Sequence, residues 1–205
     1  CRVSGLAPNA VGVVATVRAL KMHSGRFRVV AGKPLPEDIV KEDLDSLRAG
    51  AGNLGKHIEN VALYGIPAVV AINRFPTDTD NEMSELTEIA TKAGATKVVV
   101  NEAWAKGGAG AEAFAQAIVE ACNKPSKFRF LYDPSAPIKD KISAVCTKMY
   151  GAKGVRYSHS AEAAINRLTA LGFGSLPVCM AKTHLSLSHD PKLLGRPEGF
   201  NVPVD

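Results

Sequence analysis

The chain has 205 residues, 46% of them hydrophobic, and a formal net charge of +5, which fits one large or two small globular domains with a substantial core. No apolar run approaches the roughly 20 residues of a membrane-spanning helix, and the N-terminus lacks a signal-peptide pattern, so no membrane association is expected. The basic residues are dispersed, so nucleic-acid binding has little support, and an excess of lysine and arginine near an anionic small molecule explains the charge equally well.

The four cysteines are scattered, without CxxC spacing or a neighbouring histidine cluster: Cys1, Cys122, Cys146 and Cys179. Because three of them fall within apolar periodic segments, we expect buried, reduced thiols rather than disulfides or a metal site. The chain begins with a cysteine instead of methionine and soon enters a strand-like run, so we expect it to be a piece of a longer protein.

The first predicted element is a buried strand over residues 10–17, a nearly continuous apolar run. Polar and basic side chains sit at its end or just beyond it: Thr16, Arg18, Lys21 and His23. Cations and hydroxyls in this position can meet phosphate. The alternative is a solvated basic loop.

Residues 41–64 are predicted to form one helix, because apolar residues recur at spacings of three and four. These residues are Leu44, Leu47, Ala51, Leu54, Ile58 and Val61. Gly50, Gly52 and Gly55 weaken this helix, so close packing or a break is expected there. Gly65 is suited to the position just past its end.

The chain is organised around residues 66–80. The segment opens with a short apolar run, rich in Val and Ile, that is typical of a strand buried on both faces of a parallel sheet. A polar segment follows at once, with Asn73, Arg74, Phe75, Pro76, Thr77 and Asp78. Ligands of open α/β sheets bind beyond the carboxyl ends of the strands, and this set suits a planar, heteroatom-rich ligand. The alternative is an ordinary turn at Pro76 and Asp78, with Phe75 in the core.

Thr79 followed by Glu82 is a capping-box pattern that starts a helix ending at Gly94. A third short strand is predicted over residues 97–100. A further helix should point Phe114, Ala115, Ile118, Val119 and Cys122 inward. The alternation of strands and helices through residue 122 is the repeating unit of a parallel, doubly wound sheet.

Because parallel strands bring their carboxyl ends to one edge of a sheet, we expect residues 16–23, 73–78 and 101–110 to surround one ligand. Phe75 and Trp104 would then form a stacking pair for a heteroaromatic ring. The alternative is that both rings cap the core at the sheet edge.

Gly107 and Gly108 can bring backbone N–H groups to an anion. As a phosphate loop this segment is weak, because the chain contains neither GxxxxGK[ST] nor GxGxxG. Asn73 and Asp78 do not have the Asn-Lys-x-Asp spacing of guanine binders, so a guanine-specific role is doubtful. No catalytic triad or set of metal ligands is evident.

Residues 124–127 are interpreted as a linker between an α/β pocket region, residues 1–125, and a smaller C-terminal α/β region, residues 126–205. In the second region we expect a half-buried strand over residues 128–132 and helices over residues 137–151 and 161–171. A last strand is predicted over residues 176–181, followed by a loop-rich tail.

Six segments carry a resemblance to a known family. They are residues 14–25 (VATVRALKMHSG), 53–60 (NLGKHIEN), 71–79 (AINRFPTDT), 104–108 (WAKGG), 176–182 (LPVCMAK) and 194–200 (LGRPEGF). Their sequences and order resemble the formate–tetrahydrofolate ligase (10-formyltetrahydrofolate synthetase) family over essentially the whole chain. Ser24 departs from the glycine usual in that family, which loosens one turn.

The resemblance implies the C-terminal part of a parallel, doubly wound sheet of the P-loop NTPase type, followed by the smaller α/β region. It implies part of an ATP-dependent ligase of one-carbon metabolism that joins formate to tetrahydrofolate through formyl phosphate, giving 10-formyltetrahydrofolate. The compartment would be the cytoplasm, with the mitochondrial matrix as the alternative. The alternative function is a non-catalytic folate- or nucleotide-binding or assembly domain of a truncated or degenerate paralogue.

In the family, an aromatic pair matching Phe75 and Trp104 stacks on ring ligands of the folate/nucleotide pocket. The resemblance makes pocket-lining candidates of Asn73, Arg74, Thr77, Asp78, Lys106, Gly107 and Gly108, and places Thr16, Arg18 and Lys21 on the nucleotide side. It assigns no catalytic residue and no metal ligand.

The family's phosphate-binding loop lies in an N-terminal region that this chain lacks. ATP and Mg²⁺ both require that region, so we expect the chain to be inactive by itself. The implied partners are the small molecules tetrahydrofolate, formate and ATP, and the full-length protein is expected to be a homo-oligomer.

Overall fold

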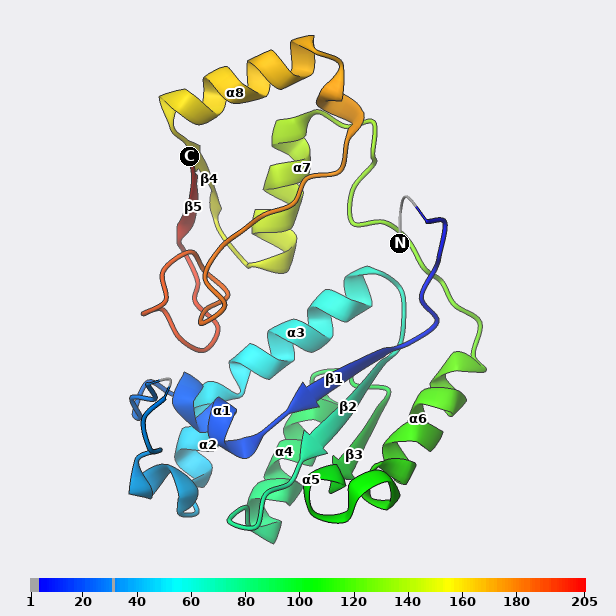
Figure 1. The fold of residues 1–205 in the computed structure, drawn as a ribbon, viewed down its shortest axis with the longest axis vertical. Helices are drawn as coiled ribbons and strands as arrows, with labels where there is room; N and C mark the ends of the chain where they lie inside the picture. The colour runs from blue at the N-terminus through cyan, green and yellow to red at the C-terminus, as the bar shows by residue number, and fades with distance from the viewer. Residues whose placement is uncertain (1–3, 31) are drawn as a thin grey trace. The chain divides into compact units, whose positions relative to one another are not determined.

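The computed structural model describes residues 4–30 and 32–205. The chain divides into two compact units, residues 1–129 (unit 1) and residues 130–205 (unit 2) (Figure 1). Within the described ranges, no helix is both long enough and apolar enough to cross a bilayer.

Unit 1 is built on a three-stranded parallel sheet in the order β1-β2-β3. The strands are β1 (Val11–Ala15), β2 (Ala68–Asn73) and β3 (Lys97–Asn101). The central strand β2 is the Val- and Ile-rich run, and Val69, Val70 and Ile72 are all 0% exposed. The predicted α/β architecture with a parallel sheet is therefore confirmed.

Helices cover both faces of this sheet. One face packs on α1 (Val17–His23), α2 (Leu44–Gly50), α3 (Gly52–Leu63) and α4 (Asp80–Lys92). The other packs on α6 (Glu112–Cys122), through Ala117 and Ala121 against Val69. Figure 1 shows α3 and α6 on opposite sides of the strands. Three short elements, η1 (Glu37–Val40), α5 (Ala103–Lys106) and η2 (Gly107–Ala111), complete unit 1.

The helix predicted over residues 41–64 is two helices, α2 and α3, which meet at Ala51. The expected close packing occurs at Gly50, where an added β-carbon would lie 1.8 Å from the Leu20 carbonyl oxygen of α1. The capping box of α4 is formed as predicted, with Thr79 and Glu82 exchanging hydrogen bonds.

The predicted inward face of α6 is partly wrong, because Ala115, Val119 and Cys122 are exposed. The helix packs through Phe114, Ala117, Ile118 and Ala121 instead. Phe114 occupies the space above Gly12, where a β-carbon would lie 2.7 Å from the Phe114 ring. The small alanines that follow let the helix approach the sheet closely, which a count of large apolar residues does not anticipate.

The cysteine prediction holds only in part. Cys122, Cys146 and Cys179 are all free, as expected, but only Cys146 is buried. Cys179 lies in a segment without regular structure, and Cys122 lies on the outer side of α6. Cys1 falls outside the described residues.

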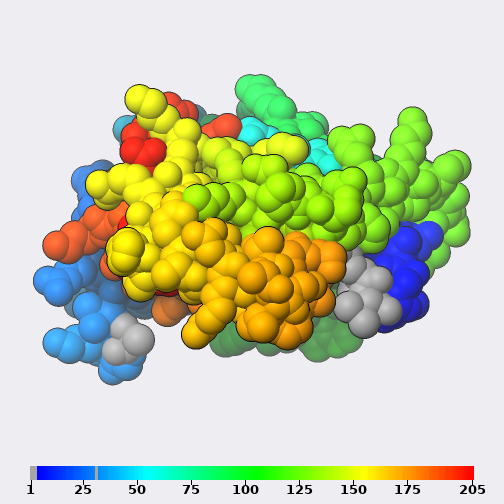
Figure 2. All heavy atoms as spheres, turned by 90° about the horizontal axis from the view of Figure 1, so that it is seen from above, coloured from blue at the N-terminus to red at the C-terminus, as the bar shows by residue number. Residues whose placement is uncertain are grey.

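Unit 2 contains a parallel strand pair, β4 (Gly154–Tyr157) and β5 (Asn201–Val204). Its helices are α7 (Ile138–Ala144), continued by the π-helical turn η3 (Val145–Met149), then α8 (His159–Ala170) and the short turn η4 (Phe173–Ser175). The core is formed by Ile142, Cys146, Ala152 and Val202. The end of α8 and the segment after it, yellow to orange in Figure 2, expose Leu171, Phe173 and Leu176.

The two strands predicted in this part of the chain are wrong. Residues 128–132 and 176–181 have no regular structure, and β4 and β5 lie elsewhere. Side chains form hydrogen bonds with backbone groups that a β-ladder would otherwise use. Lys141 Nζ donates to the Leu176 carbonyl at 3.0 Å, and the Val178 N–H donates to the Tyr132 hydroxyl at 3.1 Å. The Phe128 ring stacks on Tyr64, with centroids 6.4 Å apart.

Candidate functional site

The parallel register of unit 1 brings the carboxyl ends of its strands together. Ala15 pairs with Ile72, and Asn73 pairs with Asn101. Asn101 Nδ2 donates to Asn73 Oδ1 at 2.7 Å, and the Arg74 N–H donates to the Asn101 carbonyl at 3.0 Å. Asn101 was not singled out from the sequence, although it follows an apolar strand just as Asn73 does.

The two aromatic residues meet at this edge. The ring centroids of Phe75 and Trp104 are 6.0 Å apart, and the ring planes differ by 50°. Trp104 is 68% exposed, so most of its surface is not buried in the core of unit 1. The guanidinium of Arg18 also lies over the Phe75 ring, with its Cζ 3.8 Å from the ring centroid.

A buried carboxylate holds the turn that carries Phe75. Asp78 is 7% exposed, and its Oδ2 accepts the Phe75 N–H at 2.8 Å. Burial raises the pKa of Asp78, and the nearby Glu82 raises it further, whereas the bond from Phe75 and the charges of Arg18 and Lys21 lower it. The adjacent Thr77 is exposed.

The raised pKa of Asp78 predicts how the stability of the fold depends on pH. Because the folded-state pKa of Asp78 lies above its unfolded value, its contribution to stability is present at low pH and is lost as the pH rises through the folded pKa. In Asp78→Asn, the amide oxygen can still accept the Phe75 N–H. We therefore expect the variant to be at least as stable as the wild type near pH 7, with an advantage that shrinks towards about pH 4. Urea denaturation of both proteins at the two pH values measures this difference in stability.

The control is Asp80→Asn, at a carboxylate whose side chain is 88% exposed; it should show no comparable dependence on pH. An Asp78→Asn variant that is less stable than the wild type near pH 7 would contradict this expectation.

Lys21 is enclosed in the protein and does not line the open edge. Its side chain is 1% exposed and forms an ion pair with Glu82, which is 0% exposed. Lys21 Nζ also donates to the Ile39 carbonyl at 3.2 Å and to the Lys41 carbonyl at 2.6 Å. The three donors of its ammonium group are thus used within the protein, which leaves none for the expected nucleotide contact.

Glu82 binds more than its lysine partner. Its Oε1 accepts the Asp43 N–H at 3.1 Å, and its Oε2 accepts the Thr79 N–H at 3.1 Å. The Lys21–Glu82 pair therefore joins α1, η1, the start of α2 and the start of α4.

The remaining candidates on the first two strand ends are already engaged locally. Thr16 caps α1, its Oγ1 accepting the Ala19 N–H at 3.2 Å. Arg74 forms an ion pair with Asp80 at 2.7 Å, with its side chain 34% exposed.

The candidates after β3 lie on an open segment. Lys106 pairs with Glu102 at 2.6 Å and stays 58% exposed. Gly107 has a φ of +58°, which favours glycine, and a β-carbon on either Gly107 or Gly108 would meet nothing within 4 Å. The crowded glycine is Gly110, where a β-carbon would lie 2.4 Å from the Glu102 oxygen.

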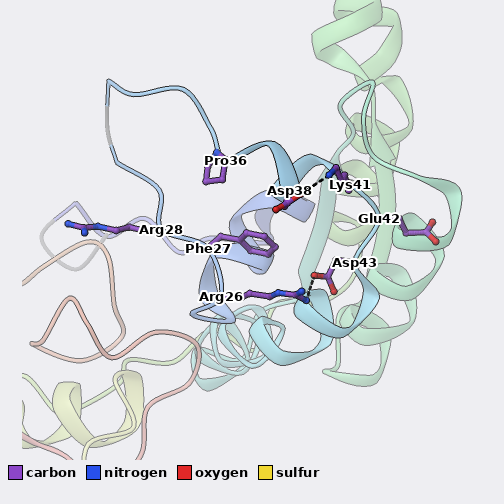
Figure 3. Close-up of a pocket in the computed structure, with 8 residues that line it drawn as sticks. All are labelled: Arg26, Phe27, Arg28, Pro36, Asp38, Lys41, Glu42 and Asp43. Atoms are coloured by element: carbon purple, nitrogen blue, oxygen red, sulfur yellow. Dashed lines mark hydrogen bonds and ion pairs between the residues drawn. The ribbon is translucent and has the colours of Figure 1, made fainter.

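A cavity of about 580 Å³ lies in unit 1, lined by residues other than those at the strand ends. It is lined by Arg26, Phe27, Arg28, Pro36, Asp38, Lys41, Glu42 and Asp43 (Figure 3). Arg26 pairs with Asp43 at 2.8 Å, and Lys41 pairs with Asp38 at 2.7 Å. Figure 3 shows Arg28 and Glu42 pointing away from these pairs. Because the charges compensate one another, the cavity has no single charge preference.

The described ranges contain no group of three or more His, Cys, Asp or Glu side chains that could hold a metal ion. The glycine segment at residues 107–110 is a 3₁₀ turn between α5 and α6, and it has no P-loop lysine.

An α/β unit that gathers asparagines, a guanidinium and two aromatic rings at the carboxyl ends of parallel strands has the arrangement of a small-molecule-binding domain. The chain belongs to the formate–tetrahydrofolate ligase family, whose sequence profile matches residues 1–205. This confirms the resemblance found in the sequence.

Similar proteins match along the entire chain. The chain is 50% identical over 204 residues to a formate–tetrahydrofolate ligase from Saccharopolyspora erythraea. It is 49% identical over 205 residues to the cytoplasmic C-1-tetrahydrofolate synthase of Schizosaccharomyces pombe and 47% identical over 204 residues to the mitochondrial one of Saccharomyces cerevisiae. The chain spans 36%, 22% and 21% of the lengths of these three relatives.

Proposed function

We propose that this chain is the part of an ATP-dependent formate–tetrahydrofolate ligase that binds the ring system of the folate at the strand ends of unit 1. The observation that carries the proposal is the exposed Trp104 beside Phe75, with ring centroids 6.0 Å apart, at the carboxyl edge of the sheet. Membership of the family supplies the reaction and the substrates.

The aromatic pair must open to admit a ligand ring between its members. A flat ring in contact with two others needs roughly 7–8 Å between them, that is, two van der Waals gaps of about 3.5–4 Å. Trp104 is the residue free to move, because it is 68% exposed and sits on the four-residue helix α5. Phe75 stays in place, because Asp78 holds its backbone.

Around the rings, we assign pocket-lining roles to Asn73, Arg74, Thr77, Asp78, Lys106, Gly107 and Gly108, and roles on the nucleotide side to Thr16 and Arg18. Lys21 is left out as a direct contact, because its ammonium group is fully bonded within the protein. Its role is to hold α1, and with it Arg18.

The reaction of the whole protein would phosphorylate formate with ATP and transfer the formyl group from formyl phosphate to the folate nitrogen. We assign no phosphoryl-transfer step to the described residues, because the sequence contains no GxxxxGK[ST] phosphate loop. The phosphate cradle and the Mg²⁺ site are assigned to the remaining length of the longer relatives, and the isolated chain is proposed to be inactive.

Three broader features are part of the proposal. The strands of unit 1 would belong to a doubly wound sheet of the P-loop NTPase type, since the apolar edge strand β1 leaves Val14 57% exposed, as if a further element covers it. The whole protein would be a homo-oligomer working in the cytoplasm or the mitochondrial matrix. The exposed Leu171, Phe173 and Leu176 in unit 2 suit contact with another chain.

Titrating the chain with tetrahydrofolate, with and without ATP, tests the proposal. Trp104 is the single tryptophan, so we expect saturable quenching of its fluorescence. Phe75→Leu should weaken binding by roughly 2- to 12-fold, because the variant loses one aromatic pair, which contributes about 0.5–1.5 kcal/mol. Phe173→Leu, at an exposed ring in unit 2, is the matched control and should bind like the wild type. Equal affinities for the wild type and Phe75→Leu would contradict the proposal.

A further inference from the structure

Arg18 differs from Arg26 and Arg74 in how its guanidinium is bonded. Its Nε is buried and has no hydrogen-bond partner within the described part of the chain. Arg26 and Arg74 donate to carboxylates at 2.8 Å and 2.7 Å. Leaving a buried N–H without a hydrogen bond costs free energy, so the unpaired Nε of Arg18 needs an explanation.

The carboxylates in the neighbourhood are committed elsewhere. Asp78 lies close enough for the Arg18 charge to lower its pKa, but its Oδ2 accepts the Phe75 N–H. Glu82 is paired with Lys21, and Asp80 is paired with Arg74. No hydrogen bond or ion pair from these three carboxylates to the guanidinium of Arg18 is present.

The position of this guanidinium is well defined. Arg18 lies in the first turn of α1, whose start is capped by Thr16, and its Cζ lies 3.8 Å from the centroid of Phe75. Stacking on an aromatic ring keeps the planar fork of donors in one orientation and leaves its edge available for hydrogen bonding. A ligand ring at Phe75 would place its own charged substituent within the same small region.

We propose that Arg18 is the anion-recognition residue of this pocket and that it binds an anionic oxygen of the ligand whose ring stacks at Phe75 and Trp104. The inference rests on the proposed function and deepens it by naming the group that is recognised. Two sources offer this chemistry: a glutamate carboxylate of the folate, or a phosphate oxygen. A planar guanidinium can bind either one through two parallel hydrogen bonds.

The experiment measures binding by calorimetry to the full-length protein that carries this chain. The three probes are tetrahydrofolate, tetrahydropteroate, which lacks the glutamate, and inorganic phosphate. The variants are Arg18→Gln, which removes the charge, and Arg18→Lys, which keeps the charge without the fork. Arg28→Gln, at an exposed arginine of unit 1, is the matched control and should behave like the wild type.

If the group is the folate carboxylate, Arg18→Gln should weaken tetrahydrofolate binding by roughly 10- to 150-fold, as for a hydrogen bond between charged groups. Tetrahydropteroate affinity should then change by less than about threefold, and Arg18→Lys should lie between. If the group is a phosphate, the phosphate affinity should fall instead and both pterins should bind almost as before.

The proposal is overturned if Arg18→Gln weakens both pterins equally and leaves phosphate unchanged, because Arg18 would then only support Phe75. It is also overturned if neither Arg18 variant changes any affinity. A wild-type protein that binds neither pterin would contradict the proposed function itself, while the phosphate measurement would still decide the role of Arg18.

Discussion

Lys21→Met is expected to destabilise unit 1 by about 3–5 kcal/mol, because breaking a buried ion pair leaves an uncompensated charge in the interior. The remaining carboxylate of Glu82 would be 0% exposed in the wild-type geometry and would keep only its bonds from Thr79 and Asp43. The substitution also removes the bonds that join α1 to the Ile39 and Lys41 carbonyls. Hydrogen exchange of the β2 amides measures the loss, because these amides lie in the core of unit 1.

Removing both charges separates the contribution of the ion pair to stability from the contribution of side-chain packing. Lys21→Met combined with Glu82→Gln should cost less than the sum of the two single substitutions, since neither charge is then left alone. Lys92→Met serves as the control, because Lys92 and its partner Glu88 form an exposed pair on α4, where little stability is at stake. A Lys21→Met variant as stable as Lys92→Met would show that the buried pair contributes nothing to the fold.

Gly50→Ala is expected to destabilise unit 1 by about 2–3 kcal/mol or more, despite the higher helix propensity of alanine. The added β-carbon would lie 1.8 Å from the Leu20 carbonyl oxygen and 2.9 Å from the Ser24 nitrogen. Both are backbone atoms of α1 or its cap, so the whole helix would have to shift. Because α1 carries Arg18, the shift should also weaken ligand binding at the strand ends, which calorimetry would detect.

Gly55→Ala is the matched comparison, because Gly55 lies in the next helix, α3. Its added β-carbon would meet only the Ala93 methyl group at 3.9 Å, so a gain of about 0.4–1 kcal/mol is expected. Denaturation of the two variants side by side should give changes of opposite sign. Similar changes in both would mean that α1 and α2 are not in close backbone contact.

Much of unit 1 could be predicted from local sequence signals. The Val- and Ile-rich run that forms β2, the capping box at Thr79 and Glu82, and the glycines at helix ends each act within a few residues. The C-terminal part of the chain was harder to predict, because the segments over residues 128–132 and 176–181 look like strands but form hydrogen bonds with side chains instead. The competition between a ladder and a side-chain donor such as Lys141 is decided by residues distant in the chain.

The same division applies to the candidate site. That Phe75 and Trp104 meet could be predicted, because each follows a strand of one parallel sheet and such strands end at a common edge. Arg18 and Lys21 are only three residues apart on α1 and look equivalent in sequence. Their roles differ because Glu82 and the Ile39 and Lys41 carbonyls come from other segments and enclose Lys21, whereas Phe75 comes to lie under Arg18.

By itself, the sequence determined the family of this protein, the parallel α/β character of unit 1 and the residues that follow each strand. These depend on apolar periodicity and on motifs contained in short segments. Only the tertiary structure decided which charges are buried in pairs, which face of α6 meets the sheet and which described arginine has a buried Nε without a hydrogen-bond partner. The reason is physical: burial and ion pairing are set by the residues that surround a side chain in space, and for Arg18 and Lys21 these come from segments far along the chain.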